Sequence, residues 1–133
     1  MTVKEWLSRG FYLNKEIMLI EKELEVAETL ATGTVKRVGG EIIQSGAENS
    51  TERNFVRCAE YALSLKRHRA ELITIKNEIF NAISKVDNST LRTLLFARYI
   101  NFETWEKIAA DLEFSVVHIY RLHGKALKCV KID

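Results

Sequence analysis

The chain of 133 residues contains no proline and only six glycines, so it has few residues that interrupt a helix. Three of those glycines, Gly33, Gly39 and Gly40, lie close together in the sequence. Outside their neighbourhood nothing breaks the helical periodicity of the apolar residues. This absence predicts an all-α fold.

Long apolar runs are also missing. No stretch approaches the roughly 20 apolar residues that cross a bilayer as a helix, and the first six residues, MTVKEW, carry no apolar segment of the signal-peptide kind. Hydrophobic residues make up 47% of the chain and charged residues 29%, which is typical of a folded globular protein. We therefore expect a cytoplasmic protein that has no contact with a membrane.

Cysteine and histidine are too sparse to build a metal site. Cys58 and Cys129 are isolated, and each lies in an amphipathic pattern where a small, half-buried side chain is the ordinary role. His118 and His123 are five residues apart, which does not place them on one helix face, and no cysteine pair lies nearby. No motif pairs a Ser or Cys with a His. We expect no metal, no cofactor and no enzymatic activity.

Two long segments carry apolar residues at alternating spacings of four and three, which is typical of helices packed as a hairpin. In residues 3–31 the stripe is Leu13, Ile17, Ile20, Leu24 and Ala27. In residues 52–86 it is Tyr61, Leu65, His68, Leu72, Ile75, Ile79, Ala82 and Val86. Residues 32–51 lack this period and contain Gly, Thr, Ser and Asn. We predict a first domain, residues 1–86, formed by a long antiparallel helical hairpin with a flexible loop at 32–51, which oligomerises or binds a partner.

The last third of the chain predicts three shorter helices. Residues 87–90, with the sequence DNST, are typical of a helix start. The helix that follows is expected to reach Ile100, to bury Leu91, Leu94, Leu95 and Ile100, and to point Arg92 and Arg98 outward. A break is expected at residues 101–103.

Residues 104–130 are expected to form two further helices, separated at residues 113–115. Thr104 and Ser115 are placed to cap them. Ala109 provides the small side chain needed where two helices cross steeply, and the apolar positions that fix the crossing are Ile108, Leu112, Phe114, Ile119 and Leu122. The pattern predicts a second domain, residues 87–133, formed by a three-helix module of the helix-turn-helix type.

Charge is distributed unevenly. Residues 115–132 hold four Lys or Arg and no Asp or Glu, although the whole chain has a net charge of only +2. Positive side chains on an outward helix face neutralise phosphates, and an Arg also reads a guanine edge. The predicted double-stranded DNA-binding residues on the last helix are Ser115, Val116, Val117, His118, Tyr120, Arg121, Lys125 and Lys128. Thr104 and Lys107 are placed to contact the adjacent DNA backbone.

These residues carry a resemblance to a known family. The sequence resembles the fourth conserved region of bacterial sigma factors, and it looks more similar still to small phage and prophage regulators of the ArpU and RinA type. The shared runs are RYI at residues 98–100, TWEKIA at residues 104–109 and IYRLHGKAL at residues 119–127. The resemblance implies a regulator of phage transcription that binds promoter DNA, with RNA polymerase as a further candidate partner, and it adds no catalytic residue.

Other interpretations of the same features remain open. Cations near the end of a helix are favourable for dipole reasons alone, so the last helix has a purely structural explanation too. The chain has two alternative roles: a protein-interaction module that binds RNA polymerase or a phage protein, and a DNA-packaging subunit of the small-terminase kind. A single recognition helix buries little DNA, so we expect a homodimer formed through the amphipathic hairpin. The basic patch Lys66, Arg67 and Arg69 is most simply a solvated helix face.

Overall fold

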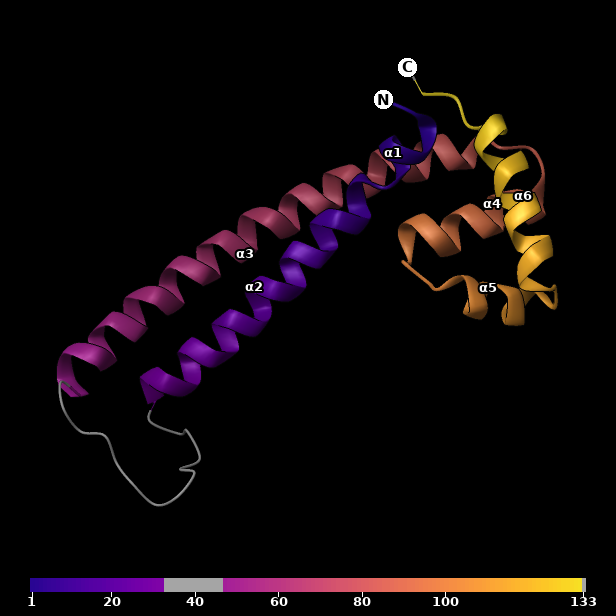
Figure 1. Cartoon of the computed structure of the whole chain (residues 1–133). Coiled ribbons are helices and arrows are strands. Elements are labelled where there is room, and N and C mark those ends of the chain that lie inside the picture. The colour runs from indigo at the N-terminus through magenta and orange to yellow at the C-terminus, as the bar shows by residue number, and fades with distance from the viewer. Residues whose placement is uncertain (33–46, 133) are drawn as a thin grey trace. The chain divides into compact units, whose positions relative to one another are not determined.

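The computed structural model describes residues 1–32 and 47–132, and within these ranges every regular element is a helix (Figure 1). The prediction of an all-α fold is thus confirmed. The elements are α1 Val3–Leu7, α2 Arg9–Thr32, α3 Ala47–Ser84, α4 Ser89–Leu95, a π-helical turn η1 Phe96–Ile100, α5 Trp105–Leu112 and α6 Val116–Cys129. None of the described helices has the length and apolar character required to cross a membrane.

The backbone divides into two compact units. Unit 1 contains residues 1–14 and 71–133, and unit 2 contains residues 15–70. Unit 1 therefore joins the start of α2 and the end of α3 to the three C-terminal helices. The predicted domain boundary between residues 86 and 87 falls inside unit 1.

Unit 2 consists of two antiparallel helices, the rest of α2 and the rest of α3 (Figure 1). The predicted stripes form their contact: Ile17, Ala27 and Leu65 are each at most 5% exposed. Nε2 of His68 lies 3.3 Å from the Glu16 carboxylate, and Arg69 forms an ion pair with Glu21 at 3.4 Å. Exposed pairs of this kind contribute little stability, so the apolar stripe holds the two helices together.

The ends of these helices differ from the prediction in two places. The expected single helix over residues 3–31 is broken at Ser8, whose hydroxyl hydrogen-bonds back to the Lys4 carbonyl at 2.6 Å. Such back-bonding competes with the regular helical pattern. Thr32 and residues 47–51, assigned to a loop from their composition, are helical and belong to α2 and α3 respectively. The remainder of that predicted loop, residues 33–46, lies outside the described residues.

The core of unit 1 is one cluster of buried apolar side chains contributed by α1, the end of α3, α4, η1, α5 and α6. Its members that are fully enclosed, at 2% exposure or less, are Leu7, Ile79, Ile83, Val86, Leu94, Leu95, Ile108, Ile119 and Ala126. Burying one of the Leu, Ile or Val side chains among them contributes about 1.5–3 kcal/mol. The end of α3, the short α1 and the C-terminal helices thus form one hydrophobic core.

Each C-terminal helix begins at a residue with a hydrogen-bonding side chain, as predicted. Asn88 accepts from the backbone amides of Thr90 and Leu91 at 3.0 and 3.1 Å. Thr104 accepts from the Lys107 amide at 3.2 Å, and Ser115 from the His118 amide at 3.1 Å. Because these side chains satisfy amides that have no partner inside the helix, they fix where α4, α5 and α6 start.

The turn between α5 and α6 is fixed by a left-handed residue. Glu113 has φ 60° and ψ 37°. The amides of Glu113 and Phe114 donate to the carbonyls of Ala110 and Ala109 at 3.3 and 3.0 Å. This is the Schellman ending, in which the left-handed position is usually Gly because a Cβ atom disfavours it. Glu113 also places a negative charge at a helix C-terminus, where the dipole is unfavourable to it.

Replacing Glu113 with Gly should therefore stabilise the protein. We expect Glu113→Gly to raise the free energy of unfolding by about 1 kcal/mol, because it removes both the left-handed strain and the charge. Urea unfolding followed by circular dichroism measures this change. Glu113→Asn should gain less, and Glu106→Gly, inside α5, should lose about 1 kcal/mol. A Glu113→Gly protein that unfolds more easily than the original would contradict the strain assigned to this turn.

Candidate nucleic-acid interface

The outward face of α6 displays most of the side chains that the sequence predicted there. Ser115, Val117, His118, Tyr120, Arg121, Lys125 and Lys128 are exposed. Arg121, Lys125 and Lys128 follow the buried residues Ile119, His123 and Ala126 by two positions each. At 3.6 residues per turn, two positions correspond to about 200°. The basic stripe therefore lies opposite the buried stripe of the same helix.

Val116 is placed differently from the prediction. Its side chain is half-buried and packs against the core of unit 1, whereas Val117 next to it is 60% exposed. The two adjacent valines thus face in different directions, as neighbouring helix positions do. Of the two, Val117 offers its methyl groups to an incoming surface.

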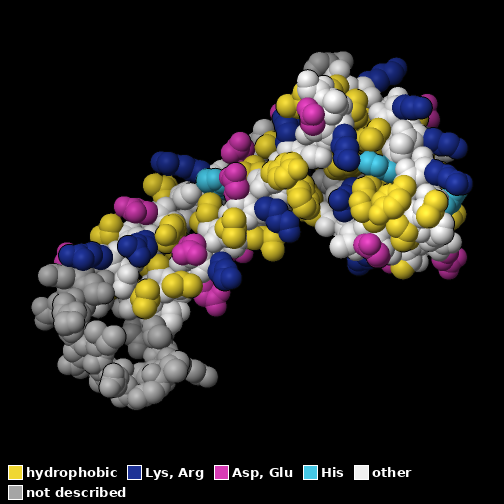
Figure 2. Space-filling model, viewed as in Figure 1, with side chains coloured by type: hydrophobic (Ala, Val, Ile, Leu, Met, Phe, Trp, Pro, Cys, Tyr) yellow, Lys and Arg dark blue, Asp and Glu magenta, His cyan; other side chains and the backbone are white. Residues whose placement is uncertain are grey.

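The basic stripe has no internal counter-charge. Among residues 1–32 and 47–132, none of the ion pairs involves Arg121, Lys125 or Lys128. In Figure 2, Lys and Arg side chains gather along the side of the molecule that carries α6. Gly124 lies within this stripe, and a Cβ atom added there would meet nothing within 4 Å. The centre of the face is therefore open to a partner.

Thr104 and Lys107, at the start of α5, are exposed too. The Lys107 side chain, however, already has ion-pair partners. The Lys107 ammonium group contacts Glu103 at 3.1 Å and Asp111 at 3.2 Å. The hydrogen bond to Glu103, and to a smaller extent the one to Asp111, raises the pKa of Lys107. A phosphate would have to displace both carboxylates, which makes Lys107 a weaker candidate than the cations of α6.

Arg92 and Arg98, before α5, do not point outward; the prediction that they would is wrong. Arg92 is half-buried and donates to the Val86 carbonyl at 2.7 Å. Arg98 is half-buried as well: its guanidinium group lies 4.2 Å from the centre of the Trp105 ring and donates to the Glu103 carbonyl at 2.9 Å. The cation–π contact and the hydrogen bond hold Arg98 beside the first residue of α5.

Two apolar predictions near the turn are also corrected. Phe114 was expected to help fix the crossing of α5 and α6, but it is 39% exposed and packs edge-on against the His118 ring, 4.8 Å away. In η1, Tyr99 is the buried residue, at 4% exposure, and Ile100 is only half-buried. The π-helical turn, closed by the Asn101 amide on the Phe96 carbonyl, changes which side chains point inward.

A buried polar pair joins η1 to α6. The Tyr99 hydroxyl lies 2.6 Å from Nε2 of His123, and His123 is only 8% exposed. Burial lowers the pKa of His123 to about 4, assisted by the positive charges of Lys4 and Arg98. Burial raises the pKa of Tyr99 to about 12. At neutral pH both groups are therefore uncharged, and the imidazole tautomer decides which of them donates the hydrogen bond.

Trp105 packs against this pair. Its ring centre lies 4.6 Å from that of His123 and 5.5 Å from that of Tyr120, both edge to face. The half-buried Trp105 thus connects the core hydrogen bond to the exposed Tyr120. Contacts of this geometry contribute about 0.5–1.5 kcal/mol each.

The buried histidine makes stability depend on pH. The pKa of His123 is lowered on folding, so its contribution is fully present above the unfolded pKa near 6.5 and is lost as the pH falls towards 4. We expect unfolding free energy to decrease by up to about 3 kcal/mol across this window. His123→Gln, which keeps an acceptor for Tyr99, should flatten the dependence, and His118→Gln at an exposed position should not. Urea unfolding at a series of pH values tests this; equal slopes for all three proteins would disprove it.

Sequence reasoning missed His123 as a core residue although a signal was present. Ile119, His123, Ala126 and Val130 follow one another at spacings of four, three and four, and each is at most 8% exposed. Leu122, chosen from its hydrophobicity, is only half-buried. His123 is classed as a polar residue in this pattern, because its hydrogen-bonding partner, the Tyr99 hydroxyl, lies in another helix and cannot be identified from the α6 sequence.

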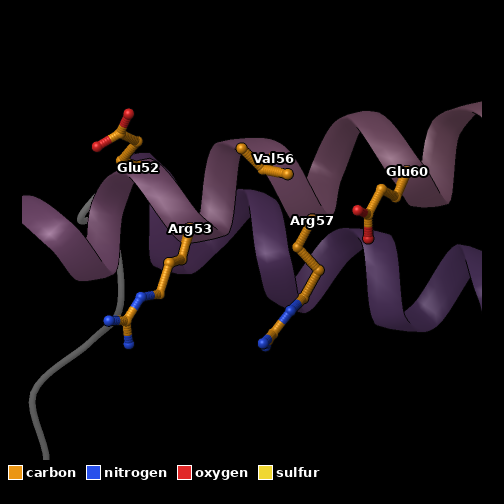
Figure 3. A pocket seen from close by; sticks show the side chains of 5 residues that line it. All are labelled: Glu52, Arg53, Val56, Arg57 and Glu60. Atoms are coloured by element: carbon orange, nitrogen blue, oxygen red, sulfur yellow. The ribbon is translucent and has the colours of Figure 1, made fainter.

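Other candidate sites are less developed. A hollow of about 570 Å³ lies along α3 and is lined by Glu52, Arg53, Val56, Arg57 and Glu60 (Figure 3). Arg53 and Arg57 point the same way, but all five side chains come from one helix, so the described residues do not converge on a ligand. Cys58 and Cys129 are free thiols. Within the described ranges no three His, Cys, Asp or Glu side chains gather as a metal site would require.

The fold and this surface define an all-α protein with an acid-free C-terminal helix. Residues 34–131, almost three quarters of the chain, match the model of the family described as a protein of unknown function, DUF1492, and the chain belongs to that family. No curated protein and no solved structure matches the chain.

Proposed function

We propose that this protein is a DNA-binding transcriptional regulator of the phage and prophage type, which uses α5 and α6 as a sigma-like helix-turn-helix. The observation that carries the proposal is the basic stripe of α6, exposed, free of internal ion pairs among the described residues and set opposite the buried face of the helix. In such modules the second helix lies in the major groove and its outward side chains contact bases and phosphates. No catalytic step is part of the proposal.

Each side chain has a distinct role in this arrangement. Arg121, in the middle of α6, donates to a guanine edge or to a phosphate, and Lys125 and Lys128 neutralise phosphates. Val117 and Tyr120 supply apolar and hydroxyl contacts. Thr104 lies at the N-terminus of α5, where free backbone amides favour the adjacent DNA backbone. The exposed Gly124 lets the helix backbone approach the DNA closely.

Removing two charges of the stripe should weaken DNA binding and reduce its salt dependence. We expect the double variant Arg121→Ala, Lys125→Ala to bind duplex DNA about 5- to 150-fold more weakly, because a guanine contact contributes about 1–3 kcal/mol. The slope of log affinity against log salt should fall by about 0.9 if Arg121 contacts a guanine and only Lys125 neutralises a phosphate, and by about 1.8 if both contact phosphates. Fluorescence anisotropy with fragments selected from the source genome measures both quantities.

A matched control removes one Lys and one Arg elsewhere. Lys22→Ala with Arg57→Ala, both exposed in unit 2, lowers the net charge equally and should leave the slope unchanged. If the α6 variant binds DNA as tightly as the unaltered protein, direct DNA binding by this face is disproved. Retained binding to RNA polymerase or to a phage protein would then favour the protein-interaction role.

We further propose that unit 2 mediates a homodimer, so that two recognition helices act together. Leu19, Val26 and Leu63 in unit 2 are 65%, 48% and 51% exposed. Leu19 and Val26 are seven residues apart, which places them on the same face two turns along α2. Large apolar side chains that recur on one exposed face are typical of a protein–protein contact.

Charges on that face should therefore separate the subunits. We expect sedimentation equilibrium to show a dimer for the unaltered protein and a monomer for Leu19→Lys with Val26→Lys, because burying two ammonium groups in an apolar contact is unfavourable. Glu28→Lys, nine residues from Leu19 and so on the opposite face of α2, should remain dimeric. A monomer at high micromolar concentration, with and without DNA, would contradict the dimer.

A further inference from the structure

A small hollow in unit 1 lies beside the proposed DNA-binding face. Lys4 and Ser8 border it from the N-terminal segment, Arg98 and Tyr99 from η1, and Trp105 from the start of α5, and its volume is about 240 Å³. Pockets that enclose a drug-sized ligand start near about 300 Å³. The size of the hollow thus favours a small chemical group over a whole cofactor.

The charge of the hollow indicates the sign of that group. Its lining contains the cations Lys4 and Arg98 and no Asp or Glu. Neither cation takes part in an ion pair among the described residues. Their combined field reaches the neighbouring His123, whose pKa both of them lower. An anion would be attracted to this place.

Arg98 is held in position, but most of its N–H donors have no partner among the described residues. A guanidinium group has five N–H donors, and the one hydrogen bond that its side chain makes with the described residues goes from Nη1 to the Glu103 carbonyl, at 2.9 Å. Trp105 covers one face of the group at 4.2 Å. The remaining N–H donors of Arg98 reach solvent, because no buried side-chain nitrogen among the described residues lacks a partner, and a phosphate oxygen is the acceptor that best matches the guanidinium fork.

The neighbouring contacts indicate where such a phosphate would come from. Trp105 borders the hollow and also packs 5.5 Å from Tyr120, which is exposed on the proposed recognition surface. Thr104, placed for the DNA backbone, precedes Trp105 directly. In helix-turn-helix complexes the first helix crosses the DNA backbone beside the groove that the second helix occupies. The hollow is thus next to the expected path of a phosphate chain.

We propose that Lys4, Arg98 and Trp105 form a clamp for one backbone phosphate of the DNA that α6 reads. This inference rests on the proposed function and extends the DNA-binding surface to the N-terminal segment of the chain. Lys4 supplies a charge from α1, Arg98 supplies paired N–H donors, and the Trp105 ring keeps the guanidinium group oriented. The clamp positions the protein on the duplex and does not read sequence.

The exposed Lys4 allows the test without disturbing the core. In DNA binding measured over a range of salt concentrations, Lys4→Gln should weaken binding and lower the slope of log affinity against log salt by up to about 0.9, the value for one phosphate, since Arg98 still contacts that phosphate. Lys4→Arg should keep the original slope, and so should Lys85→Gln, an exposed lysine outside the hollow. Equal slopes for Lys4→Gln and the unaltered protein would overturn the clamp while leaving the function of α6 intact.

Failure of DNA binding by α6 can be distinguished from failure of the clamp. If the unaltered protein binds no duplex DNA at low salt, the DNA-binding role of α6 is wrong, and inorganic phosphate then tests the hollow alone. The chain has two tryptophans, so the indole N–H signals of Trp105 and Trp6 are separable by NMR. A shift of Trp105 alone that Lys4→Gln abolishes would support anion recognition by the hollow, and no shift would overturn it.

Discussion

The burial of one face of α6 determines what its opposite face presents. Ile119, His123 and Ala126 are closed into the core of unit 1 at 8% exposure or less. Because each helix position is rotated by about 100° from the last, the stripe two positions further on must face away from the core. A rotation of α6 by one position in one direction would bury His118 and Lys125, and in the other it would put Gly124, which has no side chain, into the core. Arg121, Lys125 and Lys128 are therefore outward for a steric and energetic reason.

Two features fix the orientation of α6: the turn that precedes it and a buried hydrogen bond. The left-handed Glu113 closes α5 in a short turn, and Ser115 starts α6 within two residues. The Tyr99–His123 hydrogen bond then ties the middle of α6 to η1. A buried polar pair contributes little net stability when both partners are satisfied, but losing one partner is costly, so the pair favours a single register of α6 over its alternatives. Positioning, more than stability, is what these interactions add.

The sequence predicted the elements better than the particular contacts. Hydrophobic periodicity identified both stripes of the hairpin, and the side-chain chemistry of Asn88, Thr104 and Ser115 identified three helix starts. Each of these signals is local. The inward positions of His123, Arg92 and Arg98 depend on partners from other elements, and the π-helical turn changes the periodicity within one helix. None of these partners can be identified from a single segment of sequence.

The helix dipole explains only part of the positive charge on α6. Lys128 lies in the last turn, where the helix dipole favours a cation, so a structural role explains it. That explanation does not extend to Arg121, which lies near the middle of α6.

Arg121 and Lys125 are four residues apart, and like charges at this spacing destabilise a helix by about 0.2–0.5 kcal/mol. An acidic residue among the exposed positions of α6 would offset that repulsion, as Glu103 and Asp111 do for Lys107 on α5, yet α6 contains none. The repulsion along α6 is relieved when a polyanion lies against it. The charge pattern is therefore consistent with the proposed nucleic-acid partner and gives no support to an uncharged one.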